Sequence, residues 1–210
     1  TQDDKIQGIL YYEKIEETVK NKMDETEVTV EQFEECVKAG KCNSDNYLTA
    51  VTVEQFEECV KTNCTNNYST MRINCNYGSI GKKKHPMNCV YYKGAEAYCK
   101  WKGKMLPTEE EWEYAAKGGE DFTYAGSNNP DEVAWYEKNS EETTHEVGTK
   151  KANGYGLYDM NGNVSEWTIT PCLNFNDCYY IRGGAYLDSN ISVLTHYDSI
   201  LSKLLDYSNV

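Results

Sequence analysis

Two carboxylates flanking a short turn are the residues best suited to hold a metal ion. Asp159 and Glu166 enclose the run Met-Asn-Gly-Asn-Val-Ser. Glycine and asparagine favour tight turns whose backbone carbonyls can point inward, and Ca²⁺ takes roughly six to eight oxygen ligands. The same pattern fits a structural turn in which both carboxylates only accept hydrogen bonds from backbone amides. Both interpretations stay open on these residues alone.

Cysteine is the second residue type that could do chemistry. The 210 residues contain nine cysteines with no Cys-x2-Cys pair, and the three histidines lie far apart, at positions 85, 145 and 196. This spacing does not fit a zinc site, so it favours disulfides and an extracytoplasmic, oxidising compartment. Cys172 and Cys178 bracket a short polar loop and are the candidates for one bridge. Because nine is odd, at least one thiol stays free or pairs between chains.

The overall charge and hydropathy exclude several classes of partner. A formal net charge of −13 argues against DNA, RNA and anionic lipid, because phosphate binding needs a basic surface. No apolar run approaches the roughly 18 residues of a membrane span. The chain begins Thr-Gln-Asp-Asp without an apolar leader, so we expect any signal peptide to have been removed. The 18 tyrosines are typical of recognition surfaces, although most are expected to pack in the protein.

An exact internal repeat organises the first third of the chain. Residues 28–38 recur letter for letter as residues 51–61, and the similarity extends over segments 28–50 and 51–73. Each copy predicts a threonine N-cap followed by a short helix that buries Phe, Cys and Val. We expect residues 1–27 to form an N-terminal arm and residues 28–210 a single domain. The second helix could pack beside the first or link subunits of a homo-oligomer.

The middle and the end of the chain differ in their predicted elements. A helix is expected over residues 93–101, and another follows Thr108, whose capping box with Glu111 and closing Gly118 mark its two ends. After Gly119 the sequence indicates only short strands and turns. These features predict an α+β fold with little regular secondary structure.

Two long motifs resemble the formylglycine-generating enzyme (sulfatase-modifying factor) family. They are Ala97–Ala116, which contains Leu-Pro-Thr-Glu-Glu-Glu-Trp-Glu, and Asn153–Trp167, which contains Gly-Leu-Tyr-Asp-Met-Asn-Gly-Asn-Val-Ser-Glu-Trp. Arg182-Gly-Gly184 follows them in the family's order, and the resemblance covers about residues 24–184. It implies a C-type-lectin-like α+β fold. The family usually closes on Gly-Phe-Arg, and this sequence stops at Val210, so we expect a truncation or a few missing residues.

The resemblance also implies one calcium site. Its ligands correspond to the side chains of Asp159 and Glu166 and the backbone carbonyls of Gly162 and Val164. The family's other calcium site expects an asparagine where this chain has Val133-Ala134-Trp135. We therefore expect only the first site to be present.

The family's oxidase chemistry has no ligands in this sequence. Active members bind copper through two cysteines shortly after Arg-Gly-Gly, because Cu(I) needs soft thiolate ligands. This chain contains no cysteine after Cys178, so we expect no copper and no enzyme activity. The three histidines do not resemble the iron-binding triad of the family's sulfoxide synthases. The alternatives to a binding module are a copper-dependent oxidase acting on a substrate cysteine and a structural subunit of a surface assembly.

The segment after Arg-Gly-Gly resembles the diversified segment of variable proteins from diversity-generating retroelements. Residues 185–209 are rich in Tyr, Asp, Ser, Asn, Leu and Ile. An ordinary member of the family whose surface has drifted would look the same. In both cases we expect an exposed face that binds a protein or surface ligand. Its candidate residues are Tyr186, Asp188, Ser189, His196, Tyr197, Asp198, Asp206 and Tyr207.

Overall fold

The computed structural model describes residues 23–42, 75–173 and 178–198. Residues 1–22 of the expected arm and the second copy of the repeat lie outside the described residues. Asp206 and Tyr207 of the expected binding face lie outside them as well.

Helix α2 (Val30–Lys38) confirms the helix predicted for the first copy of the repeat. The Thr29 side chain accepts a hydrogen bond from the Gln32 N–H at 3.2 Å, and the Gln32 side chain accepts one from the Thr29 N–H at 2.8 Å. A reciprocal cap of this kind satisfies two amides that the helix itself cannot. The helix buries Val30, Phe33 and Cys36, as its spacing predicts.

Helices α4 (Tyr92–Trp101) and α5 (Glu109–Lys117) occupy the middle of the chain. The predicted Thr108–Glu111 capping box is present, and Gly118 ends α5 with a positive φ of 60°. A Cβ atom at Gly118 would come within 2.8 Å of the Asn153 side chain, so a larger residue would strain both the backbone and this contact. The four-residue helix α6 (Pro130–Val133) was not predicted, because it is too short to show a helical period.

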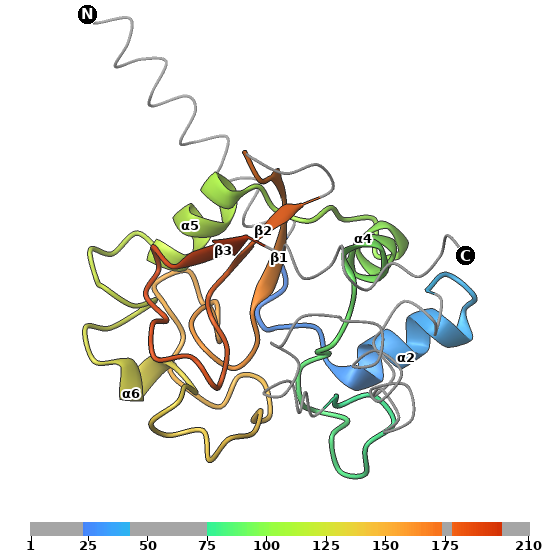
Figure 1. Ribbon diagram of the computed structural model, residues 1–210, viewed down its shortest axis with the longest axis horizontal. Coiled ribbons are helices and arrows are strands. Elements are labelled where there is room, and N and C mark those ends of the chain that lie inside the picture. Colours follow the sequence, from blue (N-terminus) through green and yellow to red (C-terminus); the bar gives the residue numbers. More distant parts are fainter. Residues whose placement is uncertain (1–22, 43–74, 174–177, 199–210) are drawn as a thin grey trace, which may run out of the picture.

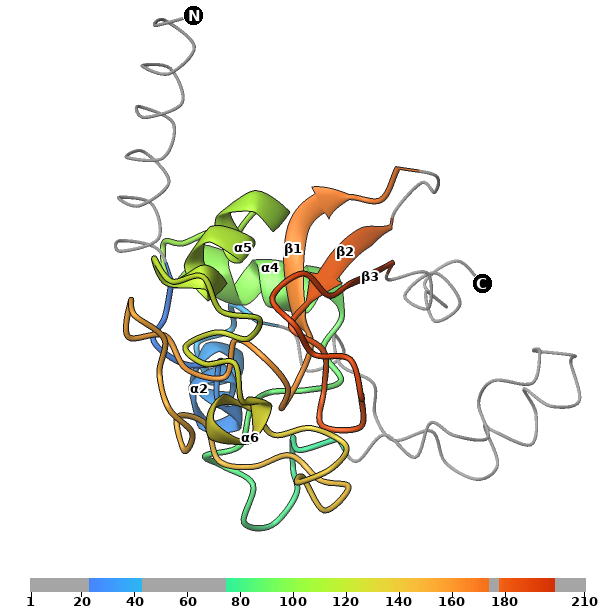
Figure 2. The ribbon, with the colours of Figure 1, turned by 90° about the vertical axis from the view of Figure 1, so that its left-hand side faces the viewer.

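Three short antiparallel strands form the sheet, in the order β1-β2-β3. They are β1 (Glu166–Pro171), β2 (Tyr179–Arg182) and β3 (His196–Asp198). A disulfide joins Cys172 and Cys178, the pair suggested by their spacing, beyond the paired ends of β1 and β2. Between β2 and β3, residues 183–195 leave the sheet and run toward α6 before returning (Figures 1 and 2).

Buried side chains gather in separate clusters beneath these elements. Trp112 of α5 is fully buried at the centre of one cluster. It packs with Leu157 and Met160 from the loop before β1 and with Val193 from the 183–195 segment. A second cluster joins α2 to α4, where the Phe33 and Tyr98 rings stack with their centroids 6.0 Å apart. Short helices, a small sheet and long ordered loops make an α+β fold with low regular secondary structure, as expected.

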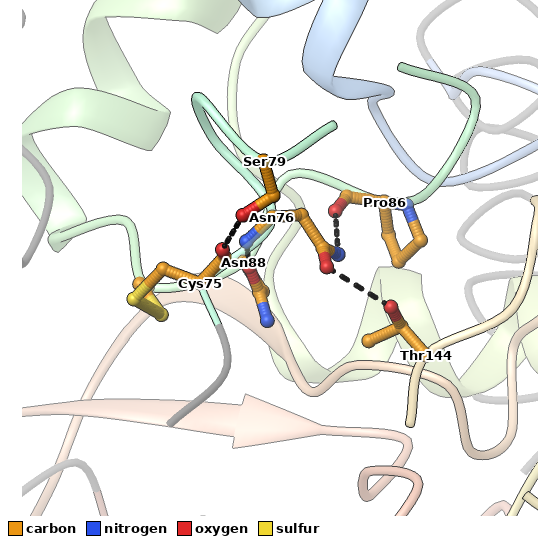
Figure 3. Close-up of a disulfide and its surroundings, with 7 residues drawn as sticks. Cys75, Asn76, Ser79, Pro86, Asn88 and Thr144 are labelled. Carbon is orange, nitrogen blue, oxygen red and sulfur yellow. Dashed lines mark hydrogen bonds between the residues drawn. A yellow bond between two sulfur atoms is a disulfide. The ribbon is translucent and has the colours of Figure 1, made fainter. Parts of the chain in front are cut away.

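Disulfides and buried amides order the long loops. Bridges join Cys36 to Cys42 and Cys75 to Cys89, and Cys99 is a free thiol in the described part of the chain. Beside the second bridge, the Asn76 amide donates to the Pro86 carbonyl at 2.8 Å and accepts from the Thr144 hydroxyl at 3.1 Å (Figure 3). These bonds fasten the loop after residue 75 to the distant loop around residue 144.

Among the described residues, no helix has the length and apolar character needed to cross a bilayer.

Candidate metal centre and recognition segment

The loop before β1 places Asp159 in the interior with one oxygen unsatisfied. The side chain is 2% exposed, and its Oδ2 accepts a hydrogen bond from the Gly148 N–H at 2.6 Å. Its buried Oδ1 has no hydrogen-bond partner. An unpaired buried carboxylate oxygen is costly, so the site favours a donor or cation at that atom. Burial raises the pKa of Asp159.

The turn after Asp159 depends on a close backbone approach at Gly162. A Cβ atom there would lie 2.2 Å from the Trp135 carbonyl oxygen, so no other residue fits. The next amide, of Asn163, donates to that same carbonyl at 2.7 Å, and the Asn163 carbonyl accepts from the Tyr186 N–H at 3.0 Å. In the described chain, no hydrogen bond from the protein ends on the carbonyl oxygens of Gly162 or Val164. Two backbone oxygens are thus left uncommitted in a tight loop.

Glu166 lies at the start of β1, against the buried indole of α5. Its Oε2 accepts a hydrogen bond from Nε1 of Trp112 at 2.7 Å. Burial, followed by the negative charge of Asp159, raises the pKa of Glu166 to about 7. A raised carboxylate pKa marks a place where negative charge is unfavourable unless a positive charge joins it.

Sequence reasoning missed a third carboxylate in this region, that of Glu27. Its Oε1 accepts from the Val164 N–H at 3.0 Å, and its Oε2 accepts from the Asn163 amide at 2.7 Å. Burial, followed by the charges of Asp159 and Glu166, raises the pKa of Glu27 well above its usual value. Nothing local in the sequence signals this contact, because Glu27 and Val164 are 137 residues apart.

The candidate donors in this loop are all oxygen atoms. The unsatisfied Asp159 oxygen, the Glu166 carboxylate and two uncommitted carbonyls are all oxygen donors, which Ca²⁺ prefers. Within the ranges that the structure describes, no three His, Cys, Asp or Glu side chains gather as a metal site made of side chains alone would require. A cation here would therefore depend on backbone carbonyls for part of its coordination.

The 183–195 segment alternates between anchored and outward residues. Ile191 packs against Val133 and Ala134 near α6, and Val193 packs in the cluster around Trp112. Leu187 and Leu194 point outward with exposed fractions of 49% and 63%. Leu187 and Leu194 therefore mark positions of this segment whose side chains do not take part in the core.

The prediction that Tyr186 belongs to an exposed face is wrong. Its side chain is buried, its amide donates to the Asn163 carbonyl, and its carbonyl accepts from the Ser140 hydroxyl at 2.8 Å. Tyr186 therefore anchors the segment to the loop around Asn163. Composition could not distinguish this role, because tyrosine suits both a core and a binding surface.

The other predicted face residues divide into three groups. Asp188 is half-buried, and its carboxylate accepts a hydrogen bond from the Ala185 N–H at 2.8 Å, which closes a turn. Ser189 is exposed, as is its neighbour Asn190, which the sequence reasoning did not single out. His196, Tyr197 and Asp198 form β3 and pair in register with Arg182, Ile181 and Tyr180 of β2.

Two of the three histidines, His85 and His145, contact residues of neighbouring loops. His85 Nδ1 lies 3.0 Å from the Thr144 hydroxyl and 3.3 Å from Nζ of Lys82. Burial, followed by the charge of Lys82, lowers the pKa of His85. The His145 ring stacks on Trp135, with centroids 3.7 Å apart.

Comparisons with known proteins agree with this architecture. The family described as "Sulfatase-modifying factor enzyme 1-like domain" matches residues 16–199. Over 137 residues the chain is 34% identical to inactive C-alpha-formylglycine-generating enzyme 2 of Bos taurus, covering 59% of this chain and 46% of that protein. Over 100 residues it is 42% identical to formylglycine-generating enzyme of Mycobacterium tuberculosis, covering 41% and 33%. The chain thus spans less than half the length of these relatives.

A solved structure shares the fold over most of its length. Treponema denticola variable protein 1 superposes with a TM-score of 0.56 at 24% identity, covering 82% of this chain and 76% of that one. At this identity the similarity shows the fold alone.

Proposed function

The chain belongs to the sulfatase-modifying factor enzyme 1-like domain family, and on that basis we propose that it is a non-catalytic, extracytoplasmic binding module. It recognises its ligand, a protein or a surface-borne group, through the outward residues of the segment after Arg182-Gly-Gly. Its family fold serves as a rigid support for that segment.

The observation that carries this proposal is the contrast between the two sides of the segment. Tyr186, Ile191, Val193 and Thr195 are buried, whereas Leu187, Ser189, Asn190 and Leu194 are exposed. Side-chain hydrogen bonds stiffen the outer loop, including one from the Thr195 hydroxyl to the Asn190 side chain at 3.0 Å. A pre-ordered surface loses little conformational entropy when it binds, which favours recognition.

The rival function, copper-dependent oxidation of a substrate cysteine, lacks suitable thiols. No cysteine follows Cys178, so the segment after Arg182-Gly-Gly offers no thiolate for Cu(I). In the described residues the free thiol is Cys99. Burial, followed by the negative charge of Asp24, raises the pKa of Cys99 to about 11. Such a thiol stays protonated at neutral pH and is a poor ligand and nucleophile. The chain resembles both a formylglycine-generating enzyme and an inactive formylglycine-generating enzyme, so the missing cysteines carry the distinction between the two functions.

Calcium is the proposed cofactor, at the loop that supports the recognition segment. Asp159 and Glu166 would supply carboxylate oxygens, and Gly162 and Val164 would supply carbonyl oxygens. Bound calcium would offset the buried negative charge and lock the loop whose Asn163 carbonyl holds Tyr186. Its part in the function is therefore structural.

The disulfides support the extracytoplasmic part of the proposal. Three bridges lie within the described residues, and such bonds persist mainly in oxidising compartments. Diversification of residues 185–209 by a retroelement is a further hypothesis. A reverse transcriptase gene beside an imperfect copy of the coding segment would support it, and the lack of both would contradict it.

Saturation mutagenesis tests residues 185–195 as the presenting segment. The variants are displayed on a host cell, and a probe for folded protein reports the folded fraction. Substitutions at Leu187, Ser189, Asn190 and Leu194 should leave the displayed folded fraction near the wild-type level. Polar substitutions at Ile191 and Val193 should abolish it, because each would place an unpaired polar group in a core cluster. Equal sensitivity of the outward and buried positions would refute a presenting surface.

A further inference from the structure

One buried carboxylate connects the segment before α2 to the candidate calcium loop. Glu27 accepts hydrogen bonds from the Val164 amide at 3.0 Å and from the Asn163 side chain at 2.7 Å. Two residues earlier, the Glu25 carbonyl accepts from the Tyr158 N–H at 2.8 Å. The segment thus contacts the loop on both sides of Asp159.

These bonds fix one peptide group of the loop from both sides. The Val164 N–H donates to Glu27, and the carbonyl of the same peptide unit, on Asn163, accepts from the Tyr186 N–H. With that unit held, the carbonyls on either side, of Gly162 and Val164, are the ones that remain uncommitted. They are the same two carbonyls proposed as calcium ligands.

The presence of a carboxyl group at position 27 needs an explanation that hydrogen bonding does not provide. A glutamine could also accept from the Val164 amide, without burying a negative charge beside Asp159 and Glu166. Among the described side chains, no lysine or arginine forms an ion pair with any of these three carboxylates. Three buried carboxylates in this region without a counter-charge repel one another, and a divalent cation bound through Asp159 and Glu166 would offset that effect.

We infer that Glu27 is a positioning residue of the calcium centre, which couples cation binding to the docking of residues 24–30. The inference rests on the proposed calcium site. Both oxygens of Glu27 are directed at the loop, toward the Asn163 side chain and the Val164 amide, so we assign Glu27 to positioning the loop and not to the ligand set. It acts by fixing the Asn163–Val164 peptide and by adding a third negative charge near the cation.

Terbium luminescence provides the test, because Tb³⁺ occupies calcium sites and is excited through a nearby tryptophan. Trp112 donates to Glu166 at 2.7 Å, so it lies beside the proposed ion. We expect Tb³⁺ to bind the wild type, Ca²⁺ to displace it, and Glu27→Gln to weaken binding roughly tenfold or more, as is usual when a residue supporting metal ligands is lost. Glu25→Gln is the matched control: this exposed side chain lies in the same segment, and binding should stay at the wild-type level.

The outcomes separate the inference from the calcium proposal. Absence of Tb³⁺ binding by the wild type, or unchanged binding by Asp159→Asn, would overturn the calcium site itself. If Glu27→Gln binds Tb³⁺ with wild-type affinity while Asp159→Asn no longer binds it, only the role of Glu27 is overturned. A purely structural Glu27 would lower the melting temperature equally in calcium and in EDTA, whereas the inference predicts that the calcium-induced rise becomes smaller.

Hydrogen–deuterium exchange on the wild type tests the coupling even if Glu27→Gln does not fold. Adding Ca²⁺ should slow exchange in peptides that cover residues 24–30 as well as residues 158–166. Peptides from α4, which carries none of the proposed ligands, report any general effect on stability. Slower exchange in the loop with no change in residues 24–30 would refute the coupling.

Discussion

The indole nitrogen of Trp112 lies 2.7 Å from Oε2 of Glu166, so the central residue of the core cluster also holds a proposed calcium ligand. Trp112 comes from α5 and Glu166 begins β1, and the bond joins helix, sheet and loop at one point. The fold thus fixes the orientation of the Glu166 carboxylate before any ion binds.

Replacing Trp112 with phenylalanine removes this donor and leaves a small cavity. We expect Trp112→Phe to lower the free energy of unfolding by about 2–4 kcal/mol, through the unsatisfied carboxylate and the lost packing. Urea titration followed by far-UV circular dichroism measures the change. Trp101→Phe should cost less, since Trp101 is only partly buried. Similar values for the two variants would contradict the Trp112–Glu166 bond.

Arg182 is a buried cation whose partners come from α5 and the 183–195 segment. Its guanidinium lies 3.0 Å from Glu109, 3.1 Å from Glu113 and 2.8 Å from the Val193 carbonyl. Removing one partner of a buried pair leaves uncompensated charge, so Arg182→Met should cost about 3–5 kcal/mol. Arg182→Lys should also be clearly destabilising, because an ammonium cannot reach all three acceptors in one plane. A loss below about 1 kcal/mol for both variants, in thermal or urea unfolding, would rule out this network.

Asn153 ties the end of α5 to the loop before β1 through both of its polar atoms. Its amide donates to the carbonyls of Ala115 at 2.7 Å and Ala116 at 3.0 Å, and its oxygen accepts from the Leu157 amide at 3.1 Å. Asn153→Asp replaces the donor with a charged acceptor that faces two carbonyls, so we expect a loss of roughly 3 kcal/mol.

Differential scanning calorimetry measures this loss, with Asn128→Asp as the control. The exposed Asn128 side chain only accepts a hydrogen bond, from the Thr123 N–H, and a carboxylate can do the same. The melting temperature of Asn128→Asp should stay near that of the wild type. An equally small shift for Asn153→Asp would show that its donor bonds do not form.

The lowered pKa of His85 predicts that the protein loses stability on acidification. Its pKa is lowered in the folded state from the ordinary value of 6.5, by burial first and then by Lys82; His145 acts in the same direction and Glu146 against it. Below about pH 6.5 the unfolded chain therefore takes up the proton first, and the folded state loses stability as the pH falls toward the lowered folded-state pKa.

Substituting His85 with asparagine isolates this effect. Urea unfolding at pH 7.5 and 5.5 should show a smaller acid-induced loss for His85→Asn than for the wild type. If both proteins lose the same free energy over this interval, His85 is not held in its neutral form by the fold.

Local sequence signals predicted the parts of the fold that local chemistry determines. The caps at Thr29 and Thr108 were visible because each requires only a few neighbouring residues, and Cys172 and Cys178 lie close enough for a loop to bring them together. The family motifs predicted the α+β fold and placed Asp159 and Glu166 in one loop.

Contacts between distant residues could not be read from the sequence. Glu27 meets Val164, and Asn76 meets Thr144, only after the whole chain has folded. Tyr186 was misassigned for a related reason, since its burial depends on loops that precede it by many residues. Sequence composition singled out residues 185–209 for the proposed binding face, but it could not tell which of their side chains face outward.

Oxygen consumption by the Cu(I)-treated protein with a cysteine-containing peptide tests the central claim most directly. The absence of thiolates after Arg182-Gly-Gly predicts that the protein retains no stoichiometric Cu(I) and consumes oxygen no faster than the same copper and peptide without protein. Tight one-to-one copper binding with repeated turnover of the peptide thiol would contradict a purely recognitional role.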